Sequence, residues 1–257
     1  MKNDNVIVIG SSQPNIGYIA RTNTAGKEFE MVTQYIDHLI KKYSKLKKKK
    51  AVIFIEPQID TGYPDIVVME YFSKPSLPWK SVRSSLSSTD YKILFYIQSE
   101  RYLSVEKISE LLGYPVDVVG KSMSRLESCG LIHISKSKKY VRNIPLNMYY
   151  RIHKIIAIEA KIDKWQAAIR QANNNIWFST ESYILMNRET YSSAVSSMCE
   201  SMGLGIIVAN GEIKTLLPSQ KRKGPISYAS LQFNEWFLRY IYRENVEEKN
   251  GASSVVI

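Results

Sequence analysis

The stretch Ile155-Ile156-Ala157-Ile158-Glu159-Ala160-Lys161 decides the fold of this chain. Four apolar residues are followed by a carboxylate and an ammonium group. Side chains alternate between the two faces of a strand, so Glu159 and Lys161 are expected on one face, with Ala160 on the other face and in the core. Charged groups at the end of so apolar a strand need partners or a metal ion.

A second apolar strand is expected to supply a partner for this pair. Pro64-Asp65 directly precedes Ile66-Val67-Val68-Met69, and Asp65 on a neighbouring strand would provide the second carboxylate. Two carboxylates with waters suit Mg²⁺, a hard cation that prefers oxygen ligands, and Mn²⁺ is the alternative ion. The metal would polarise a phosphoryl oxygen. Lys161 would orient or deprotonate the attacking water and stabilise developing negative charge.

The segments around these motifs alternate between strand and helix patterns. A first helix begins after Gly26, where apolar residues recur at helical spacing. Further helices are predicted at 164–176 and 191–202, and strands at 51–56, 66–71, 154–162, 183–186 and 205–209. This alternation predicts an α/β core.

A block at residues 80–150 departs from this alternation. It follows a linker rich in serine and proline and contains three predicted helices, at 90–97, 104–112 and 116–128, and a basic hairpin. The block resembles the winged helix-turn-helix family in Leu103-Ser104-Val105-Glu106-Lys107-Ile108, in Leu126-Glu127-Ser128-Cys129-Gly130-Leu131-Ile132 and in the hairpin. The resemblance implies contact with duplex DNA through the third helix and the wing. The candidate DNA-binding residues are Lys121, Ser124, Arg125, Lys136, Lys138 and Lys139. In the alternative interpretation the block is a packing or dimerisation module with solvated lysines.

At Pro64-Asp65 and Glu159-Ala160-Lys161 the chain resembles the PD-(D/E)xK nuclease superfamily. The resemblance implies a restriction-endonuclease-like αβα sandwich, formed by residues 1–79 and 151–257, into which the winged helix at 80–150 is inserted. It also implies a glutamate on the first helix, for which Glu30 is preferred over Glu28, and an inward glutamine, Gln171, on the helix after the second motif. The catalytic set would then be Asp65, Glu159, Lys161, Glu30 and Gln171, with Asp65 and Glu159 as metal ligands. The span between Asp65 and Glu159 is unusually long for the family, and the inserted domain accounts for it.

The function predicted by these resemblances is that of a Mg²⁺-dependent endodeoxyribonuclease, which hydrolyses phosphodiester bonds while the winged helix grips duplex DNA. Restriction, defence and repair are roles consistent with it. The alternative is a DNA-binding regulator or an assembly protein whose nuclease-like core is catalytically silent. Asp65 would then cap a turn, and Glu159 and Lys161 would form an ordinary ion pair.

Composition agrees with a polyanionic partner and argues against several other classes. The 257 residues carry a formal charge of +11. No apolar run approaches the length of about 18 residues expected of a membrane span. The two cysteines, Cys129 and Cys199, lack metal-site spacing, so we expect a reduced cytoplasmic chain without zinc. Apolar residues between Phe233 and Ile241 recur at helical spacing, which predicts a helix that packs on the core or forms a homodimer contact.

Overall fold

The computed structural model describes residues 5–21, 25–46, 49–71, 79–100, 103–135, 141–187, 193–224 and 227–252, with only the backbone for 244–252. These residues form two compact units. The first, here called the sheet unit, comprises Met1–Ser73 and Ile152–Ile226. The second, here called the winged-helix unit, comprises Lys74–Arg151 and Ser227–Ile257. Within the described ranges, no helix has both the length and the apolar character that crossing a membrane requires.

The described strands of the sheet unit form one mixed sheet of seven strands. Their order is β1 (Val6–Ile9), β2 (Lys50–Ile55), β3 (Ile66–Tyr71), β6 (Ile152–Ala160), β7 (Glu181–Met186), β8 (Gly205–Asn210) and β9 (Glu212–Leu217). β6, β7 and β8 run parallel, whereas β3 runs antiparallel to both β2 and β6. The start of β3 therefore lies at the same end of the sheet as the ends of β2 and β6.

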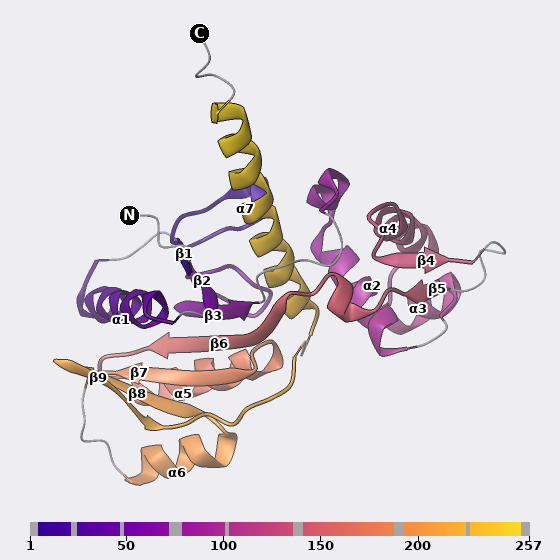
Figure 1. Ribbon diagram of the computed structural model, residues 1–257. Coiled ribbons are helices and arrows are strands. Elements are labelled where there is room, and N and C mark those ends of the chain that lie inside the picture. The colour runs from indigo at the N-terminus through magenta and orange to yellow at the C-terminus, as the bar shows by residue number, and fades with distance from the viewer. Residues whose placement is uncertain are drawn as a thin grey trace. The chain divides into compact units, whose positions relative to one another are not determined.

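Helices cover both faces of this sheet (Figure 1). On one face, α1 (Lys27–Ser44) packs its apolar side on strand residues that include Ile66, Ile158 and Ala160. On the other face, α5 (Trp165–Asn174) and α6 (Ser193–Met202) pack on residues that include Ile184 and Ile206. A mixed sheet with helices on both faces confirms the α/β class predicted from the sequence. Ala160 is fully buried, which confirms its expected place in the core.

The two edge strands were not predicted from the sequence. β1 has only four residues, too few to show a clear alternation. β9 is mostly exposed and carries polar residues such as Glu212 and Lys214, so it lacks the apolar signal of the central strands. Charged side chains on an edge strand discourage pairing with other chains.

The winged-helix unit contains the predicted helices and hairpin. Its elements are η2 (Ser81–Ser85), α2 (Ser88–Ser99), α3 (Val105–Leu112), α4 (Val116–Ser128), β4 (Ile132–Ile134), β5 (Val141–Asn143), η3 (Leu146–Met148) and α7 (Tyr228–Ala252). Val119, Met123 and Leu126 of α4 are buried, which confirms the inward face expected for that helix. Ser104 caps α3, since its side chain accepts a hydrogen bond from the Lys107 backbone N–H.

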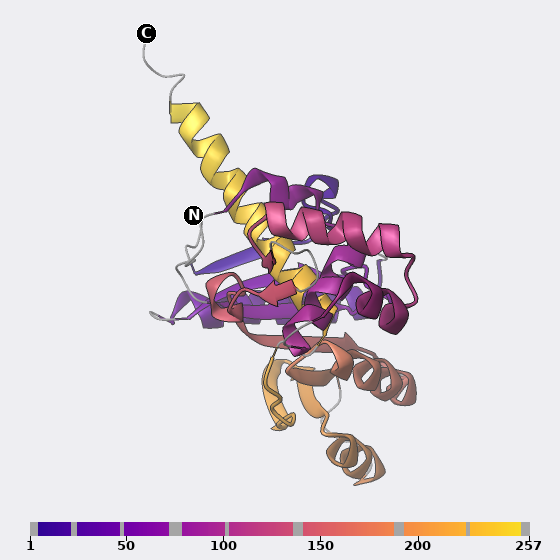
Figure 2. The ribbon, with the colours of Figure 1, turned by 90° about the vertical axis from the view of Figure 1, so that its right-hand side faces the viewer.

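The C-terminal helix belongs to the winged-helix unit, which corrects the assignment of residues 227–257 to the core. Phe233, Trp236 and Phe237 of α7 are buried, and the helix packs on α2 (Figure 2). The Arg83 guanidinium pairs with both carboxylate oxygens of Glu235, and each side chain is at most 3% exposed. The amphipathic pattern of α7 predicted that the helix is packed, but such a pattern does not identify the surface it packs on.

We predict that Glu235→Ala destabilises the winged-helix unit by about 3–5 kcal/mol, because Arg83 would remain buried without its counter-ion. Urea unfolding followed by tryptophan fluorescence would measure the loss, since Trp79 lies over the Arg83 guanidinium at 4.7 Å. The double variant Arg83→Met/Glu235→Met removes both charges and is expected to recover most of the stability. Equal losses in the single and double variants would contradict this account.

Candidate functional site

Three carboxylates meet at the end of the sheet where β3 begins. Ile66 of β3 pairs with Ile55 of β2 and with Ile158 of β6, so the next position outward on each strand is acidic. Asp65 accepts a hydrogen bond at Oδ2 from the Ala160 backbone N–H at 2.7 Å. Its own carbonyl oxygen accepts one from the Glu56 backbone N–H at 3.0 Å. Glu56, Asp65 and Glu159 thus lie side by side on three neighbouring strands.

Glu159 is the most deeply buried of these acids, with 2% of its surface exposed. Its Oε1 accepts a hydrogen bond from Asn175 Nδ2 at 2.6 Å. Its Oε2 is buried and has no hydrogen-bond partner among the described residues. Burial, and then the charge of Asp65, raises the pKa of Glu159 to about 8. Burial likewise raises the pKa of Asp65, although Lys161 opposes the shift. A buried, unpaired carboxylate oxygen is costly, and a bound cation would remove that cost.

Lys161 is the first residue after β6 and reaches both an acid of α1 and Asp65. Its Nζ lies 3.1 Å from Glu28 Oε2 and 3.9 Å from Asp65 Oδ2. The helix glutamate at the site is therefore Glu28 and not Glu30, which corrects the choice made from the sequence. Two residues correspond to about 200° of rotation around a helix, so the exposed Glu30 points away from the direction of Glu28.

The amide at the site also differs from the expected one. Gln171 is exposed on α5, whereas Asn175, in the turn η4 (Asn175–Trp177) after that helix, is buried against Glu159. Ala168, Ala172 and Asn175 follow the buried face of the helix, and Gln171 lies off that face. The spacing of the buried positions was a usable signal for Asn175.

Asp65 and Glu159 are the residues that could hold a metal ion. Within the described part of the chain, no group of three or more His, Cys, Asp or Glu side chains is arranged for metal binding. Mg²⁺ keeps several waters and commonly takes only one or two carboxylates from a protein. The unpartnered Oε2 of Glu159, beside a second carboxylate, fits such a cation.

The predicted DNA-binding residues fall into three groups. Lys121 and Ser124 are exposed on α4, where Lys121 pairs with Asp117 at 3.3 Å. Arg125 instead turns inward, and its guanidinium lies 2.8 Å from Oδ1 of Asp90 on α2. Lys136, Lys138 and Lys139 lie outside the described residues.

Asp90 explains why Arg125 turns inward. Its carboxylate is fully buried and also accepts hydrogen bonds from the Ser122 hydroxyl at 2.5 Å and from the Ser87 backbone N–H at 2.7 Å. Burial works to raise the pKa of Asp90, but these hydrogen bonds and those of Arg125 outweigh it and hold the pKa below its usual value. Arg125 thus ties α4 to α2, a structural task that the sequence pattern did not reveal.

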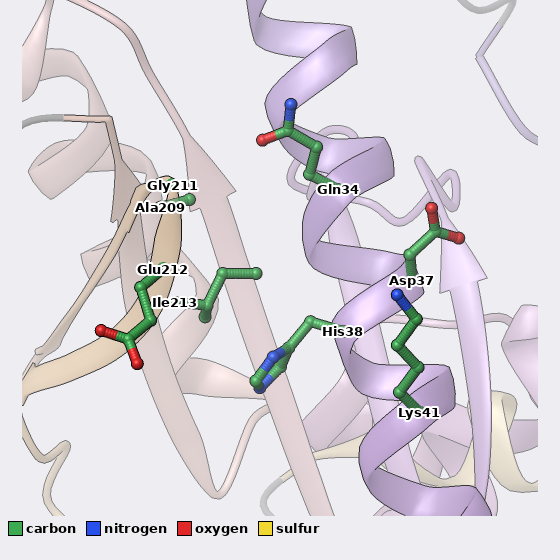
Figure 3. A pocket seen from close by; sticks show the side chains of 8 residues that line it. All are labelled: Gln34, Asp37, His38, Lys41, Ala209, Gly211, Glu212 and Ile213. Atoms are coloured by element: carbon green, nitrogen blue, oxygen red, sulfur yellow. The ribbon is translucent and has the colours of Figure 1, made fainter.

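A separate pocket of about 380 Å³ lies between α1 and the β8–β9 hairpin (Figure 3). His38 and Gln34 point toward the hairpin, whereas the carboxylates of Asp37 and Glu212 point away from each other. These polar groups do not converge on one position. Unlike the carboxylate site, the pocket therefore offers no single point at which several side chains could bind a ligand.

Comparison with known proteins identifies one part of the chain. The family model of the winged helix-turn-helix DNA-binding domain matches residues 86–133. No curated protein and no solved structure matches the chain. The matched range covers α2, α3, α4 and the first residues of the wing, so this part of the protein is a DNA-binding winged helix-turn-helix domain.

We predict that the stability of the protein depends on pH through Glu159. The pKa of this carboxyl is about 8 in the folded protein against an ordinary value of 4.5, so between these values the folded state keeps a proton that the unfolded state has lost. The stabilisation is complete below about pH 4.5 and is lost as the pH rises toward about 8. Glu159→Gln cannot ionise, so the variant should not lose stability as the pH rises toward about 8. It also keeps an oxygen that accepts the hydrogen bond from Asn175. Its melting temperature in EDTA should therefore exceed that of the wild type at about pH 8.5 and match it at about pH 5; equal differences at both pH values would refute the assignment.

We also predict that Arg125→Ala and Lys121→Ala separate stability from DNA binding. Arg125→Ala leaves the buried Asp90 without its cation and should cost about 2 kcal/mol in unfolding free energy. Lys121→Ala should leave the urea midpoint unchanged but reduce the salt dependence of duplex binding, because an exposed cation near phosphate contributes counterion release. Fluorescence anisotropy with a labelled duplex measures the second effect. An unstable Lys121→Ala, or an Arg125→Ala as stable as the wild type, would disagree with the contacts described.

Proposed function

We propose that the protein is a metal-dependent DNA nuclease, in which the sheet unit hydrolyses a phosphodiester bond and the winged-helix domain binds duplex DNA. The observation that carries the proposal is the buried, unpartnered Oε2 of Glu159 beside Asp65 and Lys161. Most buried polar atoms are hydrogen-bonded within a protein, so this oxygen, unpartnered among the described residues, favours a bound cation over a purely structural ion pair.

The charge balance at the site supports a divalent cation. Around Glu159, the described residues bring together the carboxylates of Glu28, Glu56 and Asp65 with only two cations, Arg21 and Lys161. A phosphodiester would meet net negative charge there. When bound, Mg²⁺ supplies the missing positive charge and polarises the phosphoryl oxygen.

The residues of the chain have distinct roles in this proposal. Asp65 and Glu159 hold the cation, and Asn175 orients the Glu159 carboxylate through its hydrogen bond to Oε1. Lys161 orients the attacking water and stabilises the negative charge that develops on the phosphoryl oxygens. Glu28 holds the Lys161 ammonium on the α1 side of the site. The water oxygen forms the new bond to phosphorus as the bond from phosphorus to the leaving sugar oxygen breaks. The proton that the water loses passes through solvent to that sugar oxygen, which leaves as a hydroxyl group.

We predict that the wild type nicks supercoiled plasmid in Mg²⁺ and not in EDTA, and that Lys161→Ala lowers the rate by about 100-fold or more. Asp65→Asn should also weaken Mg²⁺ binding, which isothermal titration calorimetry would detect without any turnover.

Lys154→Ala is the matched control, because Lys154 lies on β6, the strand that Lys161 directly follows, and pairs with a buried glutamate, Glu181, at 2.8 Å. It should nick at the wild-type rate once folding has been checked by circular dichroism. Full activity in Lys161→Ala would eliminate its proposed role. Plasmid that is retarded in a gel but never nicked would favour the DNA-binding regulator with a silent core.

A further inference from the structure

Arg21 occupies the outer side of the carboxylate site. Its Nε donates to Glu56 Oε2 at 2.6 Å, and its NH2 group lies 3.8 Å from Asp65 Oδ1. The Arg21 side chain is 48% exposed, whereas those of Glu56 and Asp65 are 11% and 10% exposed. The guanidinium therefore covers two buried acids and presents its other edge to solvent.

Backbone pairing fixes the position of Arg21. The Arg21 N–H donates to the Glu56 carbonyl at 3.1 Å, and the Gln58 N–H donates to the Ile19 carbonyl at 2.8 Å. The buried Tyr18 anchors the same segment, since its hydroxyl lies 2.5 Å from the carbonyl oxygen of Ile55 at the end of β2. Arg21 is thus bound to Glu56 through both its main chain and its side chain.

Glu56 adopts a strained backbone to make these contacts. Its φ is 49°, the only positive φ of a non-glycine residue in the described ranges. A residue with a Cβ adopts the left-handed region at a cost, and such strain is concentrated at functional sites. Here the strained residue pairs its carboxylate with an arginine whose side chain is half exposed.

The unused donors of Arg21 are suited to a phosphate group. A guanidinium has five N–H donors in a planar fork, and among the described residues its hydrogen bond uses only Nε. The distance of 3.8 Å to Asp65 exceeds that of a hydrogen bond, so the NH2 group can donate elsewhere. The centroid of the Tyr63 ring lies 6.0 Å from Arg21 Cζ, so a cation–π contact also restricts the position of the guanidinium. Arginine in such a setting binds phosphate by two parallel hydrogen bonds.

We infer that Arg21 binds a backbone phosphate of the DNA at the carboxylate site and that Glu56 is the residue that positions it. The inference rests on the proposed function, because it assigns the substrate phosphate to that same site. Arg21 donates to the phosphate through the N–H groups that Glu56 does not use. Glu56 does not contact the phosphate and acts only by holding Arg21 in place.

The test uses the full-length protein and measures binding separately from cleavage. Anisotropy of a fluorescein-labelled duplex, with Ca²⁺ in place of Mg²⁺, gives the slope of log Kd against log salt concentration for each variant. Loss of one phosphate contact should reduce the magnitude of this slope by about 0.9 in Arg21→Ala. Arg21→Lys keeps the charge but loses the fork, so it should keep most of the slope and bind more weakly than the wild type.

Glu56→Gln separates positioning from folding. It should reduce binding in the wild-type background and have no further effect in Arg21→Ala, because a positioning residue acts only through its partner. Lys214→Ala is the control, since Lys214 is also a half-exposed cation paired with a glutamate, Glu212, at 2.8 Å. Its slope should equal that of the wild type.

The outcomes distinguish this inference from the proposed nuclease activity. An unchanged slope in Arg21→Ala overturns the phosphate contact, whether or not the wild type nicks plasmid. Additive effects of Arg21→Ala and Glu56→Gln overturn the positioning role of Glu56. A reduced slope in Arg21→Ala, together with a wild-type protein that never cleaves, would support the Arg21 contact and overturn the proposed nuclease activity.

Discussion

The pairing of β3 with β6 is the constraint on which the candidate site depends. These two strands are separated by the whole winged-helix insertion, yet the side chain of Asp65 accepts the backbone N–H of Ala160, 95 residues later. This hydrogen bond ends the ladder with a side chain in place of a strand carbonyl. It holds one carboxylate beside the strand end that carries Glu159, while the apolar partners Ile66 and Ile158 are buried directly behind them. Two acids held this close repel each other when both are ionised, so the strand register contributes to the raised pKa of Glu159.

Much of the sheet unit could be predicted from the sequence because its central strands are short apolar runs with clear ends. The positions of Asp65, Glu159 and Lys161 followed from the same runs, since each residue stands at the point where a strand begins or ends. The winged helix was recognisable for a different reason, namely the regular spacing of Val119, Met123 and Leu126 and the cap at Ser104. Local patterns of this kind report which side chains are buried.

The errors concern relations that local patterns do not encode. Glu28 and Glu30 stand in the same helical turn, and only the path of α1 over the sheet decides which one reaches Lys161. Gln171 and Asn175 differ in whether they lie on the buried face of the helix. Arg125 resembles a DNA-contacting cation until the burial of Asp90 is known. Glu56 gave no sequence signal beyond an acid at the end of a strand, because its importance comes from the backbone conformation that it adopts.

The discontinuous winged-helix unit has a consequence for how the protein is made. Arg83 and Glu235, whose side chains form its buried ion pair, are 152 residues apart in the chain. A ribosome must therefore synthesise β6, β7, β8 and β9 before α7 emerges to bury the apolar side of α2. Since loops this long close slowly and domains usually fold in the order of their synthesis, the sheet unit is complete in sequence before the DNA-binding unit can reach its final stability. The winged-helix unit therefore lacks its buried Arg83–Glu235 ion pair on the nascent chain until the residues of the carboxylate site have all been added.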